Sequence, residues 1–470
     1  MSPTRPTRSS TEALTGRRAA AAPAPAAARA PAAPTEAAPE EGAGGGAAED
    51  GRREGFPGIF RPAWAEIDLD ALAANLRRLR REVAPAQVLA VIKADAYGHG
   101  APQVSRALEA AGVDFLGAAL LEEGAEVRRA GVSAPILVLG VPRRDQLPYY
   151  RRYRLTPVVS GLDQLALWRE WTAGEAGRGG HVQPVHLQVD TGMTRLGIDE
   201  ADWPRALEMV RESPGLELAG VLSHFAEADL LESSKNPEQE GRFARALEAL
   251  TGEERSRVLV HLANTAGALH RPASRHSLVR LGLSVYGYDS AGRVRDLEPV
   301  MAVKAQTVLV RDVPPRTRVS YGGRWTAERP SRIGVVPVGY ADGYSWRLTG
   351  KAGALVRGRR VPVVGSVSMD MIHLDLTDLS PPAAADSQGR SGPGGPGGSR
   401  GPVAVGEEVV LLGRQGGERI TATELAEKVG TIPYELLCLL GLRLSRRFVG
   451  GPDGSAPWGG VRSRFHGGLS

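Results

Sequence analysis

The chain has 470 residues, 58 Lys and Arg against 53 Asp and Glu, a formal net charge of +5, and one cysteine. At about 100–200 residues per domain, this length predicts two or three domains. The single cysteine, Cys438, excludes a disulfide framework within the chain and a structural zinc site of several cysteines. No stretch approaches the roughly 18 apolar residues that span a membrane, so we expect a soluble protein. The scattered arginines lack interleaved aromatics, so the weak positive charge does not favour nucleic-acid binding.

The first 55 residues contain, beyond Met1, one large apolar residue, Leu14, in a mixture of Ala, Pro, Gly and Glu. Such a composition cannot bury enough apolar surface to offset the entropy of ordering. We therefore expect residues 1–60 to be a disordered extension. The pair Arg17-Arg18 is followed by an Ala run that prolines interrupt, which argues against a twin-arginine signal.

From about Trp64, short β-branched runs alternate with amphipathic helical stretches, the pattern that builds parallel sheets. The expected helices include Ala101–Ala111, Leu120–Ala130, Leu162–Trp171 and Pro237–Leu250. Eight runs read as strands: Val88–Ile92, Asp114–Ala119, Pro135–Gly140, Leu155–Ser160, Val185–Asp190, Leu216–Ser223, Val258–Ala263 and Leu278–Leu283. Eight is the strand count of a β/α barrel, so the sequence predicts an α/β fold with an N-terminal (β/α)8 TIM-type barrel over residues 61–298.

After about Pro299, strand follows strand, which predicts a mainly β C-terminal domain over residues 299–449. The expected strands are Met301–Val310, Ile333–Val338, Gly353–Val356, Val361–Val364, Met371–Leu376 and Glu408–Leu412. A Gly/Pro/Ser-rich segment, residues 380–402, reads as a flexible loop inserted between two strands. A short helix is expected at Thr423–Val429, and residues 450–470 read as a loose tail.

Polar residues gather at the ends of the predicted barrel strands, where barrel enzymes hold their active sites. Lys93 directly follows the apolar run Val88–Ile92, so partial burial should lower the pKa of its amine and make it a nucleophile that can form an imine. A lysine in this place is by itself more typical of an exposed strand end. The other residues at or just after the ends of predicted strands are Tyr97, Arg195, His224, Asn264, Thr265, Arg280 and Gly282.

The string Val91–Gly100 (VIKADAYGHG) resembles the pyridoxal-phosphate lysine motif of alanine racemases. Nine further segments resemble the same family, in the family's own order, and the resemblance runs from about residue 61 to residue 447. Ten ordered matches are far more specific than any single one. The nine are Ala63–Ala71 (AWAEIDLDA), Val189–Gly197 (VDTGMTRLG), Ser223–Phe225 (SHF), His261–Ala266 (HLANTA), Val279–Gly287 (VRLGLSVYG), Val319–Gly323 (VSYGG), Val338–Tyr344 (VGYADGY), Gly365–Met371 (GSVSMDM) and Thr431–Glu435 (TIPYE).

The resemblance implies that pyridoxal 5'-phosphate is bound covalently to Lys93. A phosphate needs several hydrogen-bond donors, and glycine lets the backbone approach it closely. Outside the motif context, the tyrosines of this set would read as amphipathic core residues. The positions that match the family's phosphate donors are Tyr97, Thr265, Tyr434 and the backbone N–H groups around Gly282 and Leu283.

Arg280 matches the residue that faces the pyridine nitrogen in this family. A guanidinium keeps its proton and leaves that nitrogen as an acceptor, so a carbanion is less delocalised and reprotonation at Cα is favoured over transamination. The resemblance gives His261 the role of orienting Arg280 and His224 the role of linking it to a catalytic tyrosine. Asn264 and Asp370 are supporting positions of the matched motifs.

Racemisation removes a proton from one face of Cα and returns one to the other, so two acid/base groups are expected. Lys93 is one, and Tyr340 matches the other, which in this family reaches the site from the partner subunit of a homodimer. Arg195 and the backbone N–H of Met369 match the groups that bind the substrate carboxylate. Gln188 is a departure, because many family members have at this position a lysine that becomes carbamylated and steadies the arginine. Glutamine cannot be carbamylated, but it can form neutral hydrogen bonds.

The resemblance therefore implies a cytoplasmic, homodimeric alanine racemase that interconverts L- and D-alanine and supplies D-alanine for peptidoglycan. No metal, nucleic-acid or membrane partner is expected. A broader alanine/serine racemase stays open, because the residues that exclude larger side chains cannot be identified without geometry. A non-catalytic pyridoxal-phosphate protein is disfavoured by the second domain with Tyr340, Met369 and Tyr434. A decarboxylase is disfavoured by Arg280, where a carboxylate would be expected.

Overall fold

The computed structural model describes residues 61–175, 182–289, 296–379, 401–441 and 443–451, together with Gly292 and Val294. All of them belong to one compact unit, Gly58–Ser470. The expected disordered extension lies outside the described residues, as does the predicted loop 380–402 apart from residues 401–402 and the predicted tail apart from residues 450–451. None of the helices in the described ranges is long and apolar enough to cross a membrane.

An eight-stranded parallel sheet forms the barrel, in the order β8-β7-β6-β5-β4-β3-β2-β9. Hydrogen bonds from Arg280 N to Ala263 O (3.0 Å) and from Ser277 N to Val260 O (3.1 Å) join the two ends of this order. All eight predicted strands are confirmed: β2 (Gln87–Val91), β3 (Phe115–Ala118), β4 (Ile136–Val138), β5 (Leu155–Val159), β6 (Gln183–Gln188), β7 (Leu216–Leu222), β8 (Leu259–His261) and β9 (Leu278–Leu281).

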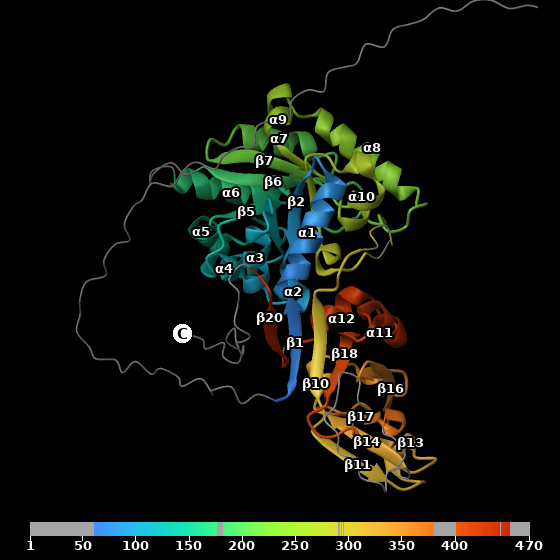
Figure 1. Ribbon diagram of the computed structural model, residues 1–470. Helices are drawn as coiled ribbons and strands as arrows, with labels where there is room; N and C mark the ends of the chain where they lie inside the picture. Colours follow the sequence, from blue (N-terminus) through green and yellow to red (C-terminus); the bar gives the residue numbers. More distant parts are fainter. Residues whose placement is uncertain are drawn as a thin grey trace, which may run out of the picture. The chain divides into compact units, whose positions relative to one another are not determined.

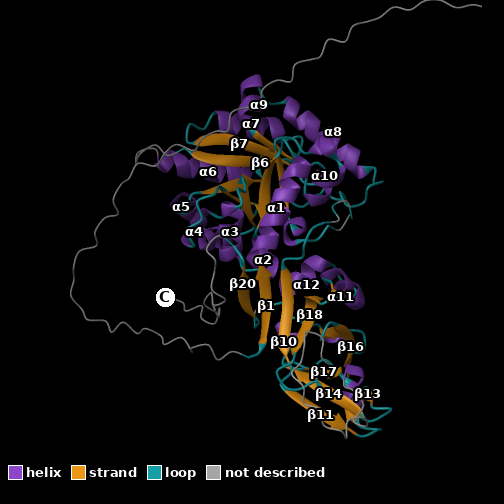
Figure 2. Cartoon of the chain, in the orientation of Figure 1, coloured by secondary structure: helices purple, strands orange, loops and turns teal. Residues whose placement is uncertain are grey.

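Helices lie outside these strands (Figures 1 and 2). In α1, the side chain of Asp68 caps the first turn by accepting from Ala71 N (2.8 Å), and Leu72, Leu76 and Leu79 repeat at the three- and four-residue spacing of a buried helical face. The helices of this layer are α1 (Leu69–Val83), α3 (Ala101–Ala110), α4 (Leu121–Arg129), α5 (Leu147–Arg152), α6 (Leu162–Glu175), α7 (Trp203–Arg211), α8 (Lys235–Glu248), α9 (Gly252–Arg257) and α10 (Thr265–His270).

The C-terminal part is mainly β, as predicted. A ten-stranded sheet has the order β11-β14-β17-β16-β15-β18-β10-β1-β20, with β19 paired to β18, and β12 and β13 form a separate two-stranded ribbon. The strands are β1 (Ala63–Asp68), β10 (Met301–Gln306), β11 (Leu309–Val313), β12 (Arg318–Val319), β13 (Trp325–Thr326), β14 (Ser331–Val336), β15 (Gly353–Val356), β16 (Arg359–Val364), β17 (Ile372–Asp375), β18 (Glu408–Gln415), β19 (Glu418–Ile420) and β20 (Ser445–Val449). Two helices, α11 (Ala422–Val429) and α12 (Pro433–Leu439), lie between β19 and β20 in the chain.

Two features of this sheet differ from the expectations. The strand β1 (Ala63–Asp68), from the segment assigned to the barrel, pairs with β10 and β20 in the ten-stranded sheet. The run expected as one strand, Met301–Val310, divides into β10 and β11, because Thr307 leaves the ladder and its hydroxyl donates to Ala404 O (2.8 Å). The first difference makes the chain enter the β-sheet before it builds the barrel.

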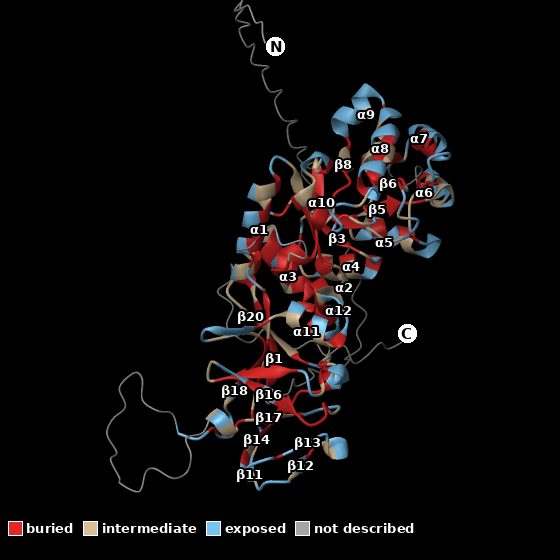
Figure 3. Cartoon of the chain, turned by 90° about the vertical axis from the view of Figure 1, so that its right-hand side faces the viewer, coloured by how far each residue is buried: buried red, intermediate tan, exposed pale blue. Residues whose placement is uncertain are grey.

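One continuous cluster of buried apolar residues includes side chains from both sheets, so the two parts share a core. Figure 3 shows that burial is concentrated in the strands and on the inner faces of the helices. Trp168, Tyr150, Tyr286 and Tyr344 are among its largest fully buried side chains. A shared core of this kind holds the C-terminal elements in a defined place beside the barrel.

Candidate active site

Lys93 is the first residue of α2 (Lys93–Gly98), a turn that follows β2. The four residues from Ala94 to Tyr97 have φ between 53° and 55°, a left-handed conformation that costs roughly 1–2 kcal/mol per residue in L-amino acids. Neighbouring side chains hold this turn. Nδ1 of His99 donates to the carbonyls of Ala96 and Tyr97 (both 2.9 Å), and the guanidinium of Arg446, from β20, donates to the carbonyl of Gly98 (2.6 Å).

Glu123, on α4, holds the start of the same turn. Its Oε1 accepts from Ala94 N (2.7 Å), and its Oε2 accepts from Ala119 N (2.8 Å) and Leu120 N (3.1 Å). One carboxylate therefore ties the backbone beside Lys93 to the loop after β3.

The amine of Lys93 is half-buried, and its pKa is lowered from the ordinary value by burial and by the positive charge of Arg195. The carboxylate of Glu123 and Cys438 act in the opposite direction. The predicted lowering is thus confirmed, and it favours the neutral, nucleophilic amine.

Arg280 lies within β9, not after it, and its side chain is 4% exposed. Its Nη1 donates to the carbonyl and to Nδ1 of His261 (2.8 and 3.1 Å), and its Nη2 donates to Nδ1 of His224 (2.9 Å) and to the carbonyls of Ser223 (2.7 Å) and Leu262 (3.0 Å). Because a guanidinium only donates, both Nδ1 atoms are acceptors in this network. The geometry therefore joins Arg280 to His261 and His224, the two histidines that the sequence placed beside it.

The histidines around Arg280 are uncharged. Burial, followed by the charge of Arg280, lowers the pKa of His224 to about 3 and that of His261 well below its ordinary value. Burial and the charge of Arg195 lower the pKa of Arg280 to about 10, which leaves the guanidinium protonated at neutral pH. A single positive charge is thus held among neutral acceptors.

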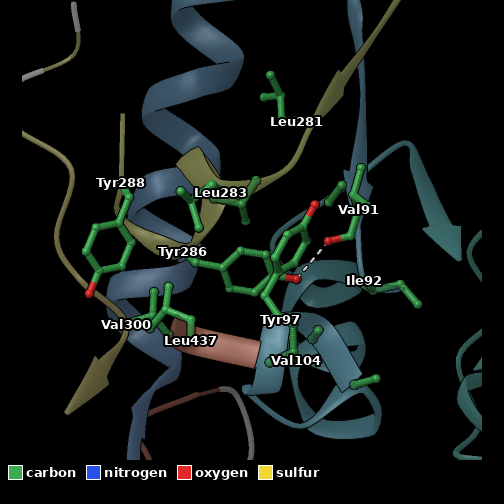
Figure 4. Close-up of a cluster of buried hydrophobic side chains, with 14 of the residues drawn as sticks. Val91, Ile92, Tyr97, Val104, Leu281, Leu283, Tyr286, Tyr288, Val300 and Leu437 are labelled. Carbon is green, nitrogen blue, oxygen red and sulfur yellow. Dashed lines mark hydrogen bonds between the residues drawn. The ribbon is translucent and has the colours of Figure 1, made fainter. Parts of the chain in front are cut away.

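Tyr97 lies in a cluster of aromatic rings. Its ring centre is 5.1 Å from that of Tyr286 and 6.1 Å from that of Tyr434, which comes from α12. The hydroxyl of Tyr286 donates to Val91 O (2.8 Å), as Figure 4 shows. Burial raises the pKa of Tyr97, so its hydroxyl stays a donor.

Gly282 lies against this cluster. A Cβ at this position would be 2.9 Å from the Tyr97 hydroxyl, so only glycine lets the backbone approach so closely. Its N–H donates to Oγ1 of Thr265 (3.0 Å), and that oxygen is 3.3 Å from Oγ of Ser284. Asn264 caps α10 by accepting from Gly267 N (3.0 Å) and thereby fixes the backbone beside Thr265. Hydroxyl and backbone donors from three segments meet here.

Arg195 is exposed in a loop that two side chains shape. The carboxylate of Asp190 accepts from the backbone N–H groups of residues 192, 193 and 194 (2.8 to 3.2 Å). The amide of Gln188 donates to the carbonyl of Leu196 (3.0 Å), next to Arg195 in the chain. Gln188 thus acts on the loop through a neutral hydrogen bond.

The sequence also placed Tyr340, Met369 and Asp370 at the site, and these lie on the β-domain. Tyr340 is 43% exposed and Met369 is 52% exposed. Their segments are joined by hydrogen bonds from Tyr340 N to Ser368 O (3.0 Å) and from Ala341 N to Met369 O (3.1 Å). Asp370 pairs with Arg443 (2.7 Å). These residues form one surface, separate from the buried network around Arg280.

The family models match this two-part architecture. Residues 67–290 match the alanine racemase N-terminal domain, and residues 300–448 match the alanine racemase C-terminal domain. An alanine racemase of Synechocystis sp. is 38% identical over 399 residues, which cover 83% of this chain and 100% of that protein. The chain belongs to the alanine racemase family. It is therefore an enzyme of the isomerase class, with the fold that the sequence predicted.

Solved structures of alanine racemases have the same fold as this chain. An alanine racemase of Clostridium difficile 630 matches with a TM-score of 0.72 and 31% identity, over 83% of this chain and 96% of that one. An alanine racemase of Bartonella henselae with covalently bound pyridoxal phosphate matches with a TM-score of 0.70 and 28% identity, over 83% of this chain and 100% of that one.

The sequence did not single out four residues that hold the site together: Glu123, His186, Tyr286 and Arg446. His186 has a recognisable signal, since it lies two residues before Gln188 on β6 and so shares its face. The roles of Glu123 and Arg446 arise from contacts between distant segments, for which the sequence offers no local pattern.

Proposed function

We propose that this chain interconverts L- and D-alanine with pyridoxal 5'-phosphate bound to Lys93. The observation that carries the proposal is the convergence of Lys93, Arg195 and Arg280. The charge of Arg195 lowers the pKa of both Lys93 and Arg280, and all three residues contribute to the lowered pKa of His224. Such a positive site favours an anionic cofactor and an anionic substrate.

The residues present fit pyridoxal phosphate. Lys93 would hold its aldehyde carbon, Arg280 would face its ring nitrogen, and its phosphate would lie in the close-approach cradle at Gly282 with the hydroxyls of Tyr97, Thr265 and Tyr434 as donors. When bound, the cofactor supplies an electron-accepting ring that stabilises negative charge at Cα.

The chain's own groups then bind the substrate and move protons. Arg195 and the backbone N–H of Met369 of the partner subunit bind the substrate carboxylate, since Met369 shares one surface with Tyr340. The lowered pKa of Lys93 gives it the neutral form that can take the α-proton from one face. Tyr340 of the partner subunit serves the opposite face, which makes the homodimer necessary for activity. The exposure of Tyr340 and Met369 within one chain supports this arrangement.

Arg280 keeps its proton and has neutral histidines as partners, so it gives none to the ring nitrogen. Charge then stays close to Cα, which favours return of the proton there. We also propose that the enzyme works in the cytoplasm and supplies D-alanine for peptidoglycan, on the strength of the family resemblance.

The test is absorption of the purified protein before and after borohydride, together with turnover of L-alanine and L-serine. We expect a borohydride-sensitive band that Lys93→Ala removes and that Lys235→Ala, a change at a surface lysine paired with Glu227, leaves intact. Alanine turnover should fall by at least roughly 10²–10⁴-fold in Lys93→Ala, the contribution of a positioned base.

The other outcomes separate the alternatives. Equal turnover of serine would identify a broader racemase, and a band without turnover would identify a pyridoxal-phosphate protein that lacks catalysis. The absence of any band would contradict the proposal.

A further inference from the structure

The cofactor, substrate and acid/base roles proposed above leave His186 without a role of its own, yet it lies inside the barrel and is 2% exposed. It sits on β6, whose neighbour in the sheet is β7 (Figure 1). The register between these strands shifts at this point, because Val185 lies opposite Leu218 whereas His186 lies opposite Gly220. Ala219 is therefore the extra residue of a β-bulge, a feature that re-aims side chains.

Gly220 makes room for the imidazole of His186. A Cβ on Gly220 would lie 2.3 Å from Nδ1 and 2.4 Å from Cε1 of that ring, which no side chain could tolerate. A glycine inside a strand commonly marks such a close approach. The bulge and the glycine together bring the ring against the side chain of His261, where Nδ1 of His186 is 2.8 Å from Nε2 of His261.

Arg280 determines which ring nitrogens of His261 and His186 carry a proton. Arg280 can only donate, so Nδ1 of His261, 3.1 Å from Nη1, must be an acceptor. The proton of neutral His261 is then on Nε2 and is donated to Nδ1 of His186. His186 in turn carries its own proton on Nε2. Burial, followed by the charge of Arg280, lowers the pKa of His186 to about 3, so this ring is neutral as well.

We propose that His186 is a positioning residue: it accepts the Nε2 proton of His261, so that the tautomer which Arg280 requires leaves no buried donor unpaired, and Gly220 provides the space. Without an acceptor at His186, the buried Nε2–H of His261 would have no partner, at a cost of about 1–3 kcal/mol, which raises the share of the tautomer with the proton on Nδ1, facing the N–H of Arg280. Two donors would then oppose each other, and the guanidinium would shift. The inference rests on the proposed function only for its effect on turnover.

Two substitutions of His186 separate the hydrogen bond from packing. His186→Leu removes the acceptor but keeps much of the volume, whereas His186→Asn places Oδ1 close to the position of Nδ1. We expect kcat for alanine to fall roughly tenfold or more in His186→Leu, the scale seen when the outer hydrogen-bond partner of a functional histidine is lost. KM should be nearly unchanged, because the substrate carboxylate is bound by other groups. His186→Asn should recover most of kcat.

Gly220→Ala tests the same contact, between His186 and His261, by a change on β7. It should displace the ring of His186 and lower kcat in the wild-type background, and it should add little to the loss in His186→Leu, since both changes break one interaction.

The direct measurement is the ¹⁵N spectrum of the holoenzyme labelled at histidine. In the wild type, His186 and His261 should both carry their proton on Nε2; in His186→Leu, the Nδ1 signal of His261 should move toward the protonated form, and in His186→Asn it should not. A wild-type His261 protonated on Nδ1, or an unchanged His261 and kcat in His186→Leu, would overturn the proposal. If no preparation turns over alanine, the proposed function fails. The tautomers of His186 and His261 in the wild type still test the positioning role of His186.

Discussion

Arg280 in the barrel is 4% exposed and donates to five acceptors, whereas Tyr340 in the β-domain is 43% exposed and is fixed through its backbone. The barrel groups need a defined protonation state, and burial among neutral acceptors provides it within one chain. The β-domain groups stand on a surface that a second copy can cover. The two regions should therefore respond differently to substitution.

Among these variants, Tyr340→Phe should cause the largest loss of activity. Because Tyr340 is exposed, it should hardly change the free energy of unfolding. A lost acid/base group costs roughly 10²–10⁴-fold in rate, whereas a surface change usually costs within about 0.5 kcal/mol. The α-deuterium effects for D- and L-alanine should be reduced unequally, because one face of Cα is affected. The measurements are isotope effects and thermal unfolding.

Tyr149→Phe is the matched control, since Tyr149 is 46% exposed on the outside of the barrel. It should leave both quantities unchanged. Full activity in Tyr340→Phe would remove the second base from the mechanism.

Glu123→Gln should affect both stability and pH dependence. An amide can replace only one of the two acceptor oxygens, so N–H groups of Ala94 or of Ala119 and Leu120 lose their partner, at a cost of about 1–3 kcal/mol. The carboxylate of Glu123 raises the pKa of Lys93, so its loss lowers that pKa. In the proposed mechanism the base is the neutral amine, so the acidic limb of the kcat profile should move to lower pH.

Glu122→Gln, a change at the exposed neighbour on α4, should leave the limb in place. A shift of the limb to higher pH in Glu123→Gln would contradict the assigned sign.

Gln188→Leu should give the smallest change in activity. It removes the hydrogen bond to Leu196 beside Arg195, so KM for alanine should rise roughly two- to tenfold, the equivalent of one neutral hydrogen bond, with kcat less affected. Gln183→Leu is its control on the same strand, because Gln183 donates to Leu155 O (3.2 Å) away from Arg195. A lowered kcat with unchanged KM would show that Gln188 does not act through substrate binding.

Most of this architecture could be predicted from the sequence, because the barrel strands are short apolar runs and most motif residues sit at or near their ends. The pairing of β1 could not be predicted, since its partners β10 and β20 are distant in the chain. The strand β20 contains Arg446 and Arg447 and shows no simple apolar alternation.

The site shows the same division. Lys93, Arg195 and Arg280 could be found from motifs, but the contact between His186 and His261 joins residues 75 positions apart. The contact between His186 and His261 depends on a bulge and on Gly220, and neither can be identified before the register of the strands is known.

The most direct test of a site shared between two copies is to co-express Lys93→Ala and Tyr340→Phe chains and assay the mixed dimers for alanine racemisation. Each parent alone lacks one base in both of its sites. In a mixed dimer, one site combines an intact Lys93 with an intact Tyr340, so random pairing should restore about a quarter of the wild-type activity. A mixture with no more activity than its parents would contradict the shared site.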